Sequence, residues 1–159
     1  MLQRCNAVLR HLEMIEGSVH CKDKGPAECG LDLLEFLEGY RGARIALVGF
    51  QPVHARRCSE RGELKILDLD VENVGREKFG VVVLDGVKDT EEVLRWCDLA
   101  LVTGTTVVNG TLEAILEVAG AKAVFYGISI AGVAQICLSS SGSVRGRREG
   151  CIFVESGIL

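Results

Sequence analysis

The sequence is poor in aromatic residues, which make up 5% of its 159 residues, although 48% of the chain is hydrophobic. A core is therefore expected to consist mainly of Val, Leu, Ile and Ala side chains. No apolar run reaches the roughly 18 residues of a membrane-spanning helix, and the first residues do not have the pattern of a signal peptide. We therefore expect a cytoplasmic protein with one domain-sized core and no membrane partner.

An excess of basic residues is also lacking. The formal net charge is −4, whereas proteins that bind nucleic acid generally carry a basic face. The one basic cluster, RGRR at residues 145–148, is short and is interpreted as a solvated loop. We expect no nucleic-acid partner.

Closely spaced cysteine pairs are absent. The seven cysteines form no C-x-x-C motif, which is the usual mark of a structural zinc site. An odd number of cysteines without an export signal also argues against a disulfide framework, so most are expected to be small buried hydrophobic residues. One alternative stays open, because the segment HCKDKGPAEC brings His20, Cys21 and Cys29 together as soft ligands for zinc or copper.

Familiar catalytic motifs are missing as well. The chain contains no G-x-S-x-G, no H-E-x-x-H and no P-loop, and no G-x-G-x-x-G follows its first predicted strand. Cys58 and His54 stand four residues apart and could share a helix face, but a reactive thiolate needs more support than that. Spacing alone therefore assigns neither catalytic residues nor a cofactor, and activity as an enzyme stays open.

Two amphipathic segments, residues 2–16 and 27–38, predict helices at the start of the chain. We expect residues 1–42 to form a helical segment that packs on the main domain, residues 43–159. The buried side of the second helix is expected to consist of Leu33, Leu34, Phe36 and Leu37.

From Ala43 onward, apolar runs typical of buried strands alternate with helical or loop segments. Alternation of this kind predicts an α/β fold with a doubly wound, mainly parallel, Rossmann-like sheet, preceded by the two N-terminal helices. The predicted strands are ARIALVG, LKILDL, VVVLD, LALVTG, AKAVFYG and CIFVES, and the predicted helices cover residues 54–61, 90–96, a segment starting near 110, and 132–138.

The stretch TGTTVVNGTLEAIL, residues 103–116, carries two signals. Its Asn-Gly pair is typical of a β-hairpin turn, whereas the apolar residues after it recur at helical spacing. Because TLEAILEVAGA is rich in helix formers, we interpret the stretch as a strand-to-helix connection. Asn109 is expected to be the N-cap of that helix, with Gly110 and Thr111 in its first turn.

Ligands of open parallel sheets bind beyond the carboxyl ends of the strands, and polar residues follow three of the predicted strands. A helix N-terminus among them suits an anion such as phosphate or carboxylate. The candidates are Gly49, Phe50, Pro52 and His54 after the first strand, Asp68 after the second, and Thr103, Gly104, Thr105, Asn109, Gly110 and Thr111 after the fourth.

Each candidate also has a purely structural interpretation. Asp68 follows Gly49 by 19 positions, near the place of a ribose-binding acid in dinucleotide folds, but it could equally cap a strand end. His54 could contact a ligand or merely begin a surface helix. Thr103 and Thr111 could satisfy nearby backbone groups. The first turn, GFQPVH, is a poor pyrophosphate loop because Phe50 and Pro52 obstruct close backbone approach.

Three segments together resemble a family named for putative heavy-metal chelation, a Rossmann-like family of prokaryotic proteins. They are LVGFQP at residues 47–52, the strand-end Asp68, and CDLALVTGTTVVNGTLEAIL at residues 97–116. The family's T-G-[ST]-x-x-x-N-G-T motif is matched by Thr103, Gly104, Thr105, Asn109, Gly110 and Thr111. The resemblance covers residues 43–130 and implies a Rossmann-like fold with a ligand cleft against an N-terminal domain similar to the amino-terminal part of enolase.

We therefore predict a domain that binds or transforms a small anionic metabolite or a metal complex of one. Two alternatives stay open. One is an enzyme dependent on S-adenosylmethionine or a nucleotide, with Asp68 on the ribose; the other is a non-catalytic interaction module built on the N-terminal helices. A homodimer is expected. The anionic part of the ligand would contact Thr105, Asn109, Gly110 and Thr111, and the rest would contact Asp68 and His54.

Overall fold

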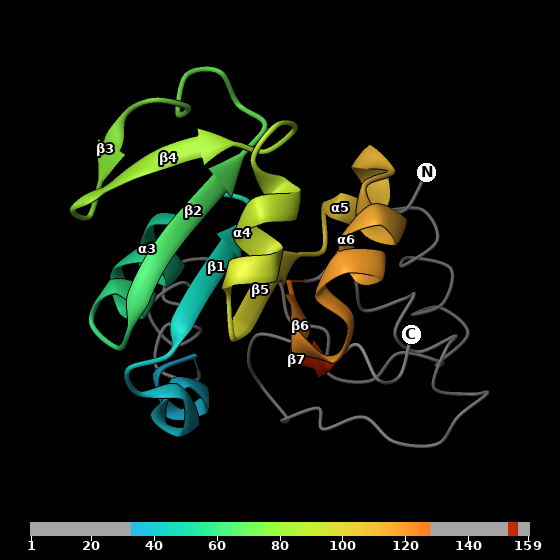
Figure 1. Ribbon diagram of the computed structural model, residues 1–159. Coiled ribbons are helices and arrows are strands. Elements are labelled where there is room, and N and C mark those ends of the chain that lie inside the picture. The colour runs from blue at the N-terminus through green and yellow to red at the C-terminus, as the bar shows by residue number, and fades with distance from the viewer. Residues whose placement is uncertain (1–32, 128–152, 156–159) are drawn as a thin grey trace, which may run out of the picture.

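The computed structural model describes residues 33–127 and 153–155. Within them the chain forms a seven-stranded sheet with the order β3-β4-β2-β1-β5-β6-β7 (Figure 1). The strands are β1 (Arg44–Val48), β2 (Glu63–Asp68), β3 (Glu77–Lys78), β4 (Val81–Asp85), β5 (Leu99–Thr103), β6 (Ala123–Tyr126) and β7 (Phe153–Glu155).

The five inner strands, β4, β2, β1, β5 and β6, pair in parallel, and β3 and β7 lie antiparallel at the two edges. From β1 the chain proceeds outward through β2 to β4, and then returns across β1 to β5 and β6. The strand order therefore reverses between β1 and β5, which confirms the predicted doubly wound, mainly parallel α/β fold.

Helices cover both faces of this sheet (Figure 1). One face carries α3 (Pro52–Ser59), which connects β1 to β2, and the other carries α4 (Thr90–Trp96) and α6 (Leu112–Ala119). The described part also contains short helical turns: the 3-10 turns η1 (Glu38–Tyr40) and η2 (Gly120–Lys122), and the one-turn helix α5 (Thr106–Asn109). No helix in these residues is both long and apolar enough to cross a bilayer.

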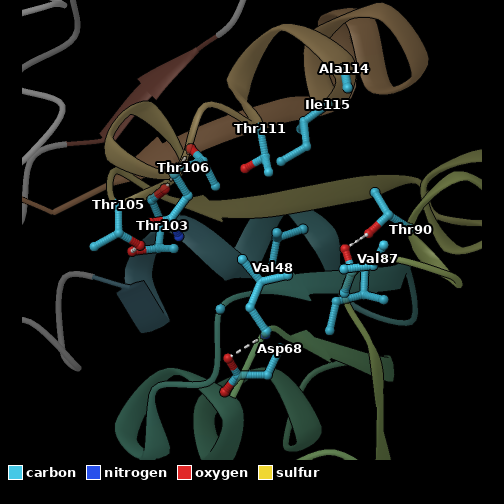
Figure 2. Close-up of a pocket in the computed structure, with 15 residues that line it drawn as sticks. Val48, Asp68, Val87, Thr90, Thr103, Thr105, Thr106, Thr111, Ala114 and Ile115 are labelled. Atoms are coloured by element: carbon cyan, nitrogen blue, oxygen red, sulfur yellow. Dashed lines mark hydrogen bonds between the residues drawn. The ribbon is translucent and has the colours of Figure 1, made fainter. Parts of the chain in front are cut away.

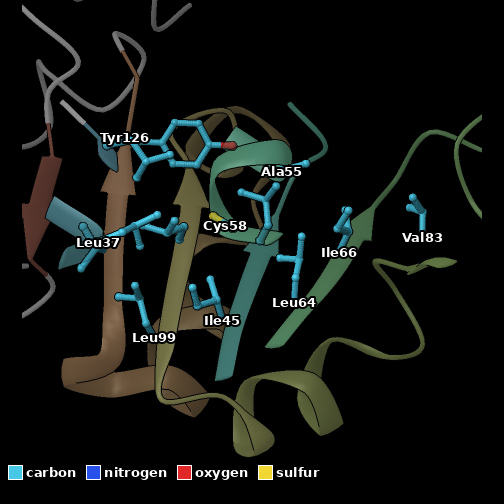
Figure 3. Packing of buried hydrophobic residues seen from close by; sticks show 13 residues of the cluster. Leu37, Ile45, Ala55, Cys58, Leu64, Ile66, Val83, Leu99 and Tyr126 are labelled. Carbon is cyan, nitrogen blue, oxygen red and sulfur yellow. The ribbon is translucent and has the colours of Figure 1, made fainter. Parts of the chain in front are cut away.

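The central strands β1, β5 and β6 are buried on both sides, as their continuous apolar runs predict, whereas β4 is only partly covered. In β1, Ile45 and Leu47 pack on the α3 side, whereas Ala46 and Val48 pack on the side of α4 and α6. Successive side chains of a strand point to opposite faces, so the two sides form two separate apolar layers. Figure 3 shows the layer on the α3 side, which includes Leu64 and Tyr126.

The N-terminal segment contributes to the α3-side layer. Residues 33–37 are helical, and both Leu33 and Leu37 have no exposed surface. They belong to the same cluster as Ile45 and Leu47 of the sheet, so this part of the segment packs on the sheet face. The helix predicted for residues 27–38 is described only from residue 33. The helices predicted at 2–16 and 132–138 lie outside the described residues.

The prediction that Asn109 caps a helix is wrong. Asn109 is the last residue of α5, and Gly110 ends that turn with a left-handed φ of 72°. The following helix, α6, starts at Leu112, with Thr111 as its N-cap residue. An extra helical turn forms because the Thr106 hydroxyl donates to the Thr103 carbonyl oxygen at 2.8 Å, and because the Asn109 N–H donates to the Thr105 carbonyl oxygen at 3.0 Å. The strand-to-helix connection itself is confirmed.

Candidate functional site

A cavity of about 270 Å³ lies at the carboxyl edge of the sheet, on the side of α4 and α6 (Figure 2). Its walls include the ends of β1 and β2, at Val48 and Asp68, and the end of β5 at Thr103. Strands β1 and β5 are the neighbours between which the strand order reverses, and ligands of open α/β sheets bind at that point. The cavity therefore occupies the position where this architecture places a binding site.

The cavity separates the eleven predicted site residues into two groups. Its lining includes Gly49, Asp68, Thr103, Thr105, Asn109 and Thr111. It does not include Phe50, Pro52, His54, Gly104 or Gly110. The prediction also omitted one wall, because Gly86 and Val87 of the loop after β4 and Thr90 at the start of α4 line the cavity. That loop follows the carboxyl end of a parallel strand, as the other candidates do, so strand-end position was the signal that could have identified it.

Gly49 is required where β1 meets the cavity. Its φ of +90° is unfavourable for other residues, and a Cβ at this position would lie 2.5 Å from Thr103 Cγ2. The Gly49 N–H donates to the Leu67 carbonyl oxygen at 2.8 Å, and its own carbonyl oxygen accepts from the Tyr126 hydroxyl at 3.2 Å. These contacts fix the ends of β1, β2 and β6 against one another.

Replacing Gly49 with alanine is therefore expected to lower the free energy of unfolding by about 2 kcal/mol, through backbone strain and the collision with Thr103. Because serine lacks Cγ2, Gly49→Ala should cost less in a Thr103→Ser background than in the natural protein. Urea denaturation of the four proteins of this double-mutant cycle measures the coupling. If the free-energy costs of Gly49→Ala and Thr103→Ser are strictly additive, the 2.5 Å contact between the new Cβ and Thr103 Cγ2 is relieved by movements that do not depend on Thr103.

Asp68 is the acidic group of the cavity, and its carboxylate is already oriented by neighbouring donors. Oδ1 accepts from the backbone N–H groups of Leu69 at 2.7 Å and Asp70 at 3.1 Å. Oδ2 accepts from the Asn73 side-chain amide at 2.9 Å. The side chain is half-buried, so it forms a fixed acceptor at the end of β2.

A threonine-rich wall faces Asp68 across the cavity (Figure 2). The Thr105 hydroxyl contacts the Thr103 hydroxyl at 3.3 Å, whereas the side chain of Asn109 is exposed and has no hydrogen-bond partner among the described residues. The first turn of α6, which includes Ala114, also lines this side. Because the first N–H groups of a helix have no partner within it, this wall suits an acceptor or a singly charged anion.

His54 lies on the other side of the sheet. It is 3% exposed and stacks on Tyr126 with ring centroids 4.4 Å apart. Its Nδ1 contacts Gln51 Oε1 at 2.7 Å, whereas its Nε2 is buried without a partner among the residues that the structure describes. Burial lowers the pKa of His54 to about 4, so the ring is neutral at physiological pH. The histidine starts a helix, as one interpretation held, but it is a core residue rather than a surface residue.

Cys58 shares that buried environment. It lies on α3 with no exposed surface, and burial raises the pKa of its thiol to about 12. A thiol with so high a pKa stays protonated and unreactive near neutral pH. The His54 and Cys58 pair therefore belongs to the packing of the α3 face.

The described residues do not fit a resident metal ion. They contain no group of three or more His, Cys, Asp or Glu side chains placed to hold one. Of the described residues that line the cavity, Asp68 alone is acidic, and its carboxylate already accepts three hydrogen bonds. The other proposed ligand set, His20, Cys21 and Cys29, lies outside the described residues.

Fold and cavity together define a Rossmann-like α/β protein with a cavity at the switch point of the sheet. The family described as "Putative heavy-metal chelation" (DUF364) matches residues 32–143, and the chain belongs to this family. No curated protein matches the chain.

Two solved structures of that family have a similar fold. One, from Desulfitobacterium hafniense, is 14% identical with a TM-score of 0.53, and covers 95% of this chain and 64% of its own. The other, from Pyrococcus horikoshii, is 18% identical with a TM-score of 0.55, and covers 96% and 65%. Both are described as proteins of unknown function. The chain thus spans just under two thirds of their length, and at these identities the likeness shows the fold alone.

Proposed function

We propose that this protein binds a small molecule with an anionic group, or a metal complex of such a molecule, in the cavity at the carboxyl edge of the sheet. The observation that carries the proposal is the cavity itself, formed at the switch point by three strand ends and the first turn of α6. The anionic group would lie against Thr105, Asn109 and Thr111, where side-chain hydroxyls, the Asn109 amide and the N–H groups of the first turn of α6 are available.

In this proposal a metal ion is part of the bound ligand and is not a resident cofactor of the protein. The family's description supports a metal-containing ligand, but the described wall of the cavity supplies one carboxylate and hydroxyl groups. Divalent transition metals generally need several imidazole, thiolate or carboxylate ligands from a protein that binds the bare ion. A metal in this cavity would therefore arrive already coordinated by an organic chelator, with Asp68 and the threonines contacting the chelator.

One observation favours a second candidate, an enzyme that uses S-adenosylmethionine or a nucleotide. Asp68 stands at the carboxyl end of β2, where dinucleotide folds place the acid that contacts the ribose hydroxyls. Against a bound pyrophosphate, however, α3 opens with Pro52 and packs on the opposite face of the sheet. The helix that follows β1 therefore offers no phosphate-binding end to this cavity.

Asn109→Ala tests the proposed site without the usual confusion between binding and folding. Because Asn109 is exposed and is not a helix cap, the substitution should change the free energy of unfolding by no more than about 0.5 kcal/mol. It should nevertheless weaken a ligand held by the threonine-rich wall. Glu117→Ala, at an exposed position of α6 outside the cavity lining, is the matched control and should bind as the natural protein does.

A thermal-shift screen supplies the measurement. The probes are small carboxylates, divalent metals with and without citrate, adenosine nucleotides and S-adenosylmethionine. A ligand at a hundredfold excess over its dissociation constant adds about 2.7 kcal/mol of stability, and Asn109→Ala should reduce that gain. Stabilisation by metal–citrate but not by either component alone would support the chelate. A screen without any response would instead favour the non-catalytic interaction module, and sedimentation would then test the expected homodimer.

A further inference from the structure

The charge of the cavity lining is one-sided. Among the described residues that line it, Asp68 is the single charged side chain, and none is Lys, Arg or His. Apolar side chains from the strand ends and α6, including Val48, Leu67 and Ile115, make up much of the remaining wall. A polyanion such as a nucleoside diphosphate would therefore enter next to a carboxylate without any cationic side chain on this wall to compensate its charge.

Asp68 retains unused acceptor capacity. An ionised carboxylate offers about four lone-pair positions, and three are occupied by the N–H groups of Leu69, Asp70 and the Asn73 amide. Two of these bonds go to Oδ1 and one goes to Oδ2, so within the described part of the chain Oδ2 keeps an open acceptor position. A donor group of the ligand, above all an ammonium group, would complete it with a charge-assisted hydrogen bond.

The end of the cavity opposite Asp68 favours an anionic group of the ligand. Figure 2 shows Thr111 and Asp68 on opposite sides of Val48, so the first turn of α6 and the carboxylate face the cavity from different ends. The N-terminal end of a helix carries the equivalent of roughly half a positive charge. That is enough to favour one carboxylate group, but it does not balance a multiply charged phosphate chain.

We propose that the ligand of this cavity is dipolar, with an ammonium or other donor group at Asp68 Oδ2 and a single carboxylate-like group at the first turn of α6. Asp68 is then the residue that determines specificity, and Asn73 positions it. This inference rests on the proposed function and narrows it, because it excludes ligands whose only charges are negative.

Three matched benzene derivatives test the charge preference on the full chain: benzylamine, benzoate and 4-(aminomethyl)benzoate. Titrations followed by ¹H–¹⁵N NMR report at the Leu69 and Asp70 amides, which donate to Asp68. Benzylamine should shift these two signals, and Asp68→Asn should weaken its binding about tenfold or more. Benzoate should shift Thr111 and Leu112 instead and should not weaken in Asp68→Asn. The zwitterion should shift both groups of signals.

Asp68→Asn would place two side-chain amides, those of residues 68 and 73, next to each other. A second variant therefore controls for a folding defect. Combining Asp68→Asn with Asn73→Asp exchanges the two side chains. The pair still has one amide donor and one carboxylate acceptor, and the carboxylate now lies at position 73. This double variant should fold and recover much of the benzylamine binding. Glu117→Gln, at an exposed position outside the cavity lining, is the charge-matched control and should leave all three affinities unchanged.

The outcomes separate this inference from the function on which it rests. Benzoate binding at the Asp68 end, or benzylamine binding that is equally strong in Asp68→Asn, would overturn the dipolar ligand while leaving a ligand site in place. If none of the three probes shifts any amide of the cavity lining, the inference fails, and the proposed function fails with it when the thermal-shift screen also gives no response. Shifts confined to amides outside the lining count as the same failure.

Discussion

Acidification from pH 7 to pH 4 is expected to remove about 3 kcal/mol from the free energy of unfolding through His54 alone. The folded protein holds the pKa of this buried histidine at about 4, against an ordinary value of 6.5. Between these two values the unfolded chain binds a proton that the folded chain rejects. Stability is therefore complete above pH 6.5 and falls as the pH drops through the window to about 4.

His54→Phe isolates this effect. Phenylalanine keeps a ring against Tyr126 but cannot titrate, and Gln51 still caps α3 because it accepts from the backbone N–H of residue 54. Urea denaturation at pH 7, 5.5 and 4.5 compares the two proteins, and carboxylates cancel in the comparison because both proteins contain them. The natural protein should lose more stability than the variant. If the two proteins instead lose the same free energy of unfolding as the pH falls, water or a proton reaches His54 Nε2 in the folded state.

Leu37→Ala is expected to cost about 3 kcal/mol, the middle of the range for a leucine removed from a close-packed core. Leu37 has no exposed surface and packs with Leu47 of β1 and Tyr126 of β6. Thermal unfolding should report the loss as a fall in Tm of roughly 6–12 °C for a chain of this size. The result also tests whether residues 1–42 are energetically separate from the sheet.

Val82→Ala is the control for Leu37→Ala. Val82 is 52% exposed on β4, so its truncation should cost no more than about 0.5 kcal/mol. If Leu37→Ala costs as little as Val82→Ala, the N-terminal segment docks weakly, and the predicted boundary near residue 42 separates two independent units. A large cost would place that boundary inside a single cooperative core.

The strands could be predicted from the sequence because burial on both faces leaves a continuous apolar run, as in Arg44–Val48. The helix Thr90–Trp96 was predicted with the same bounds that the structure has. The one-turn helix α5 could not be predicted, because four residues are too few to show periodicity. Asn-Gly is also ambiguous: it suits a hairpin, a helix end and a loop, and here Gly110 ends a helix.

The site was predictable where it depended on strand ends, as with Asp68 and Thr103. It was not predictable where it depended on which face of the sheet a helix covers. His54 comes shortly after the carboxyl end of β1, yet α3 carries it to the face of the sheet opposite the cavity. That choice is made by strand order and crossover handedness, which no local pattern encodes. Val87 also follows a predicted strand end and could have been identified by that signal, but no local pattern places β4 beside β2.

The edge strand β3 limits how copies of this protein can associate. It has two residues, Glu77 and Lys78, both charged, and it turns into β4 through Phe79 with a positive φ of 52°. Short, charged and sharply turned edges offer little to another strand. A second chain adding to the sheet here would gain almost no ladder of hydrogen bonds. Growth into an open-ended β-stack is therefore suppressed at this edge, and any pairing of two copies must use other surfaces.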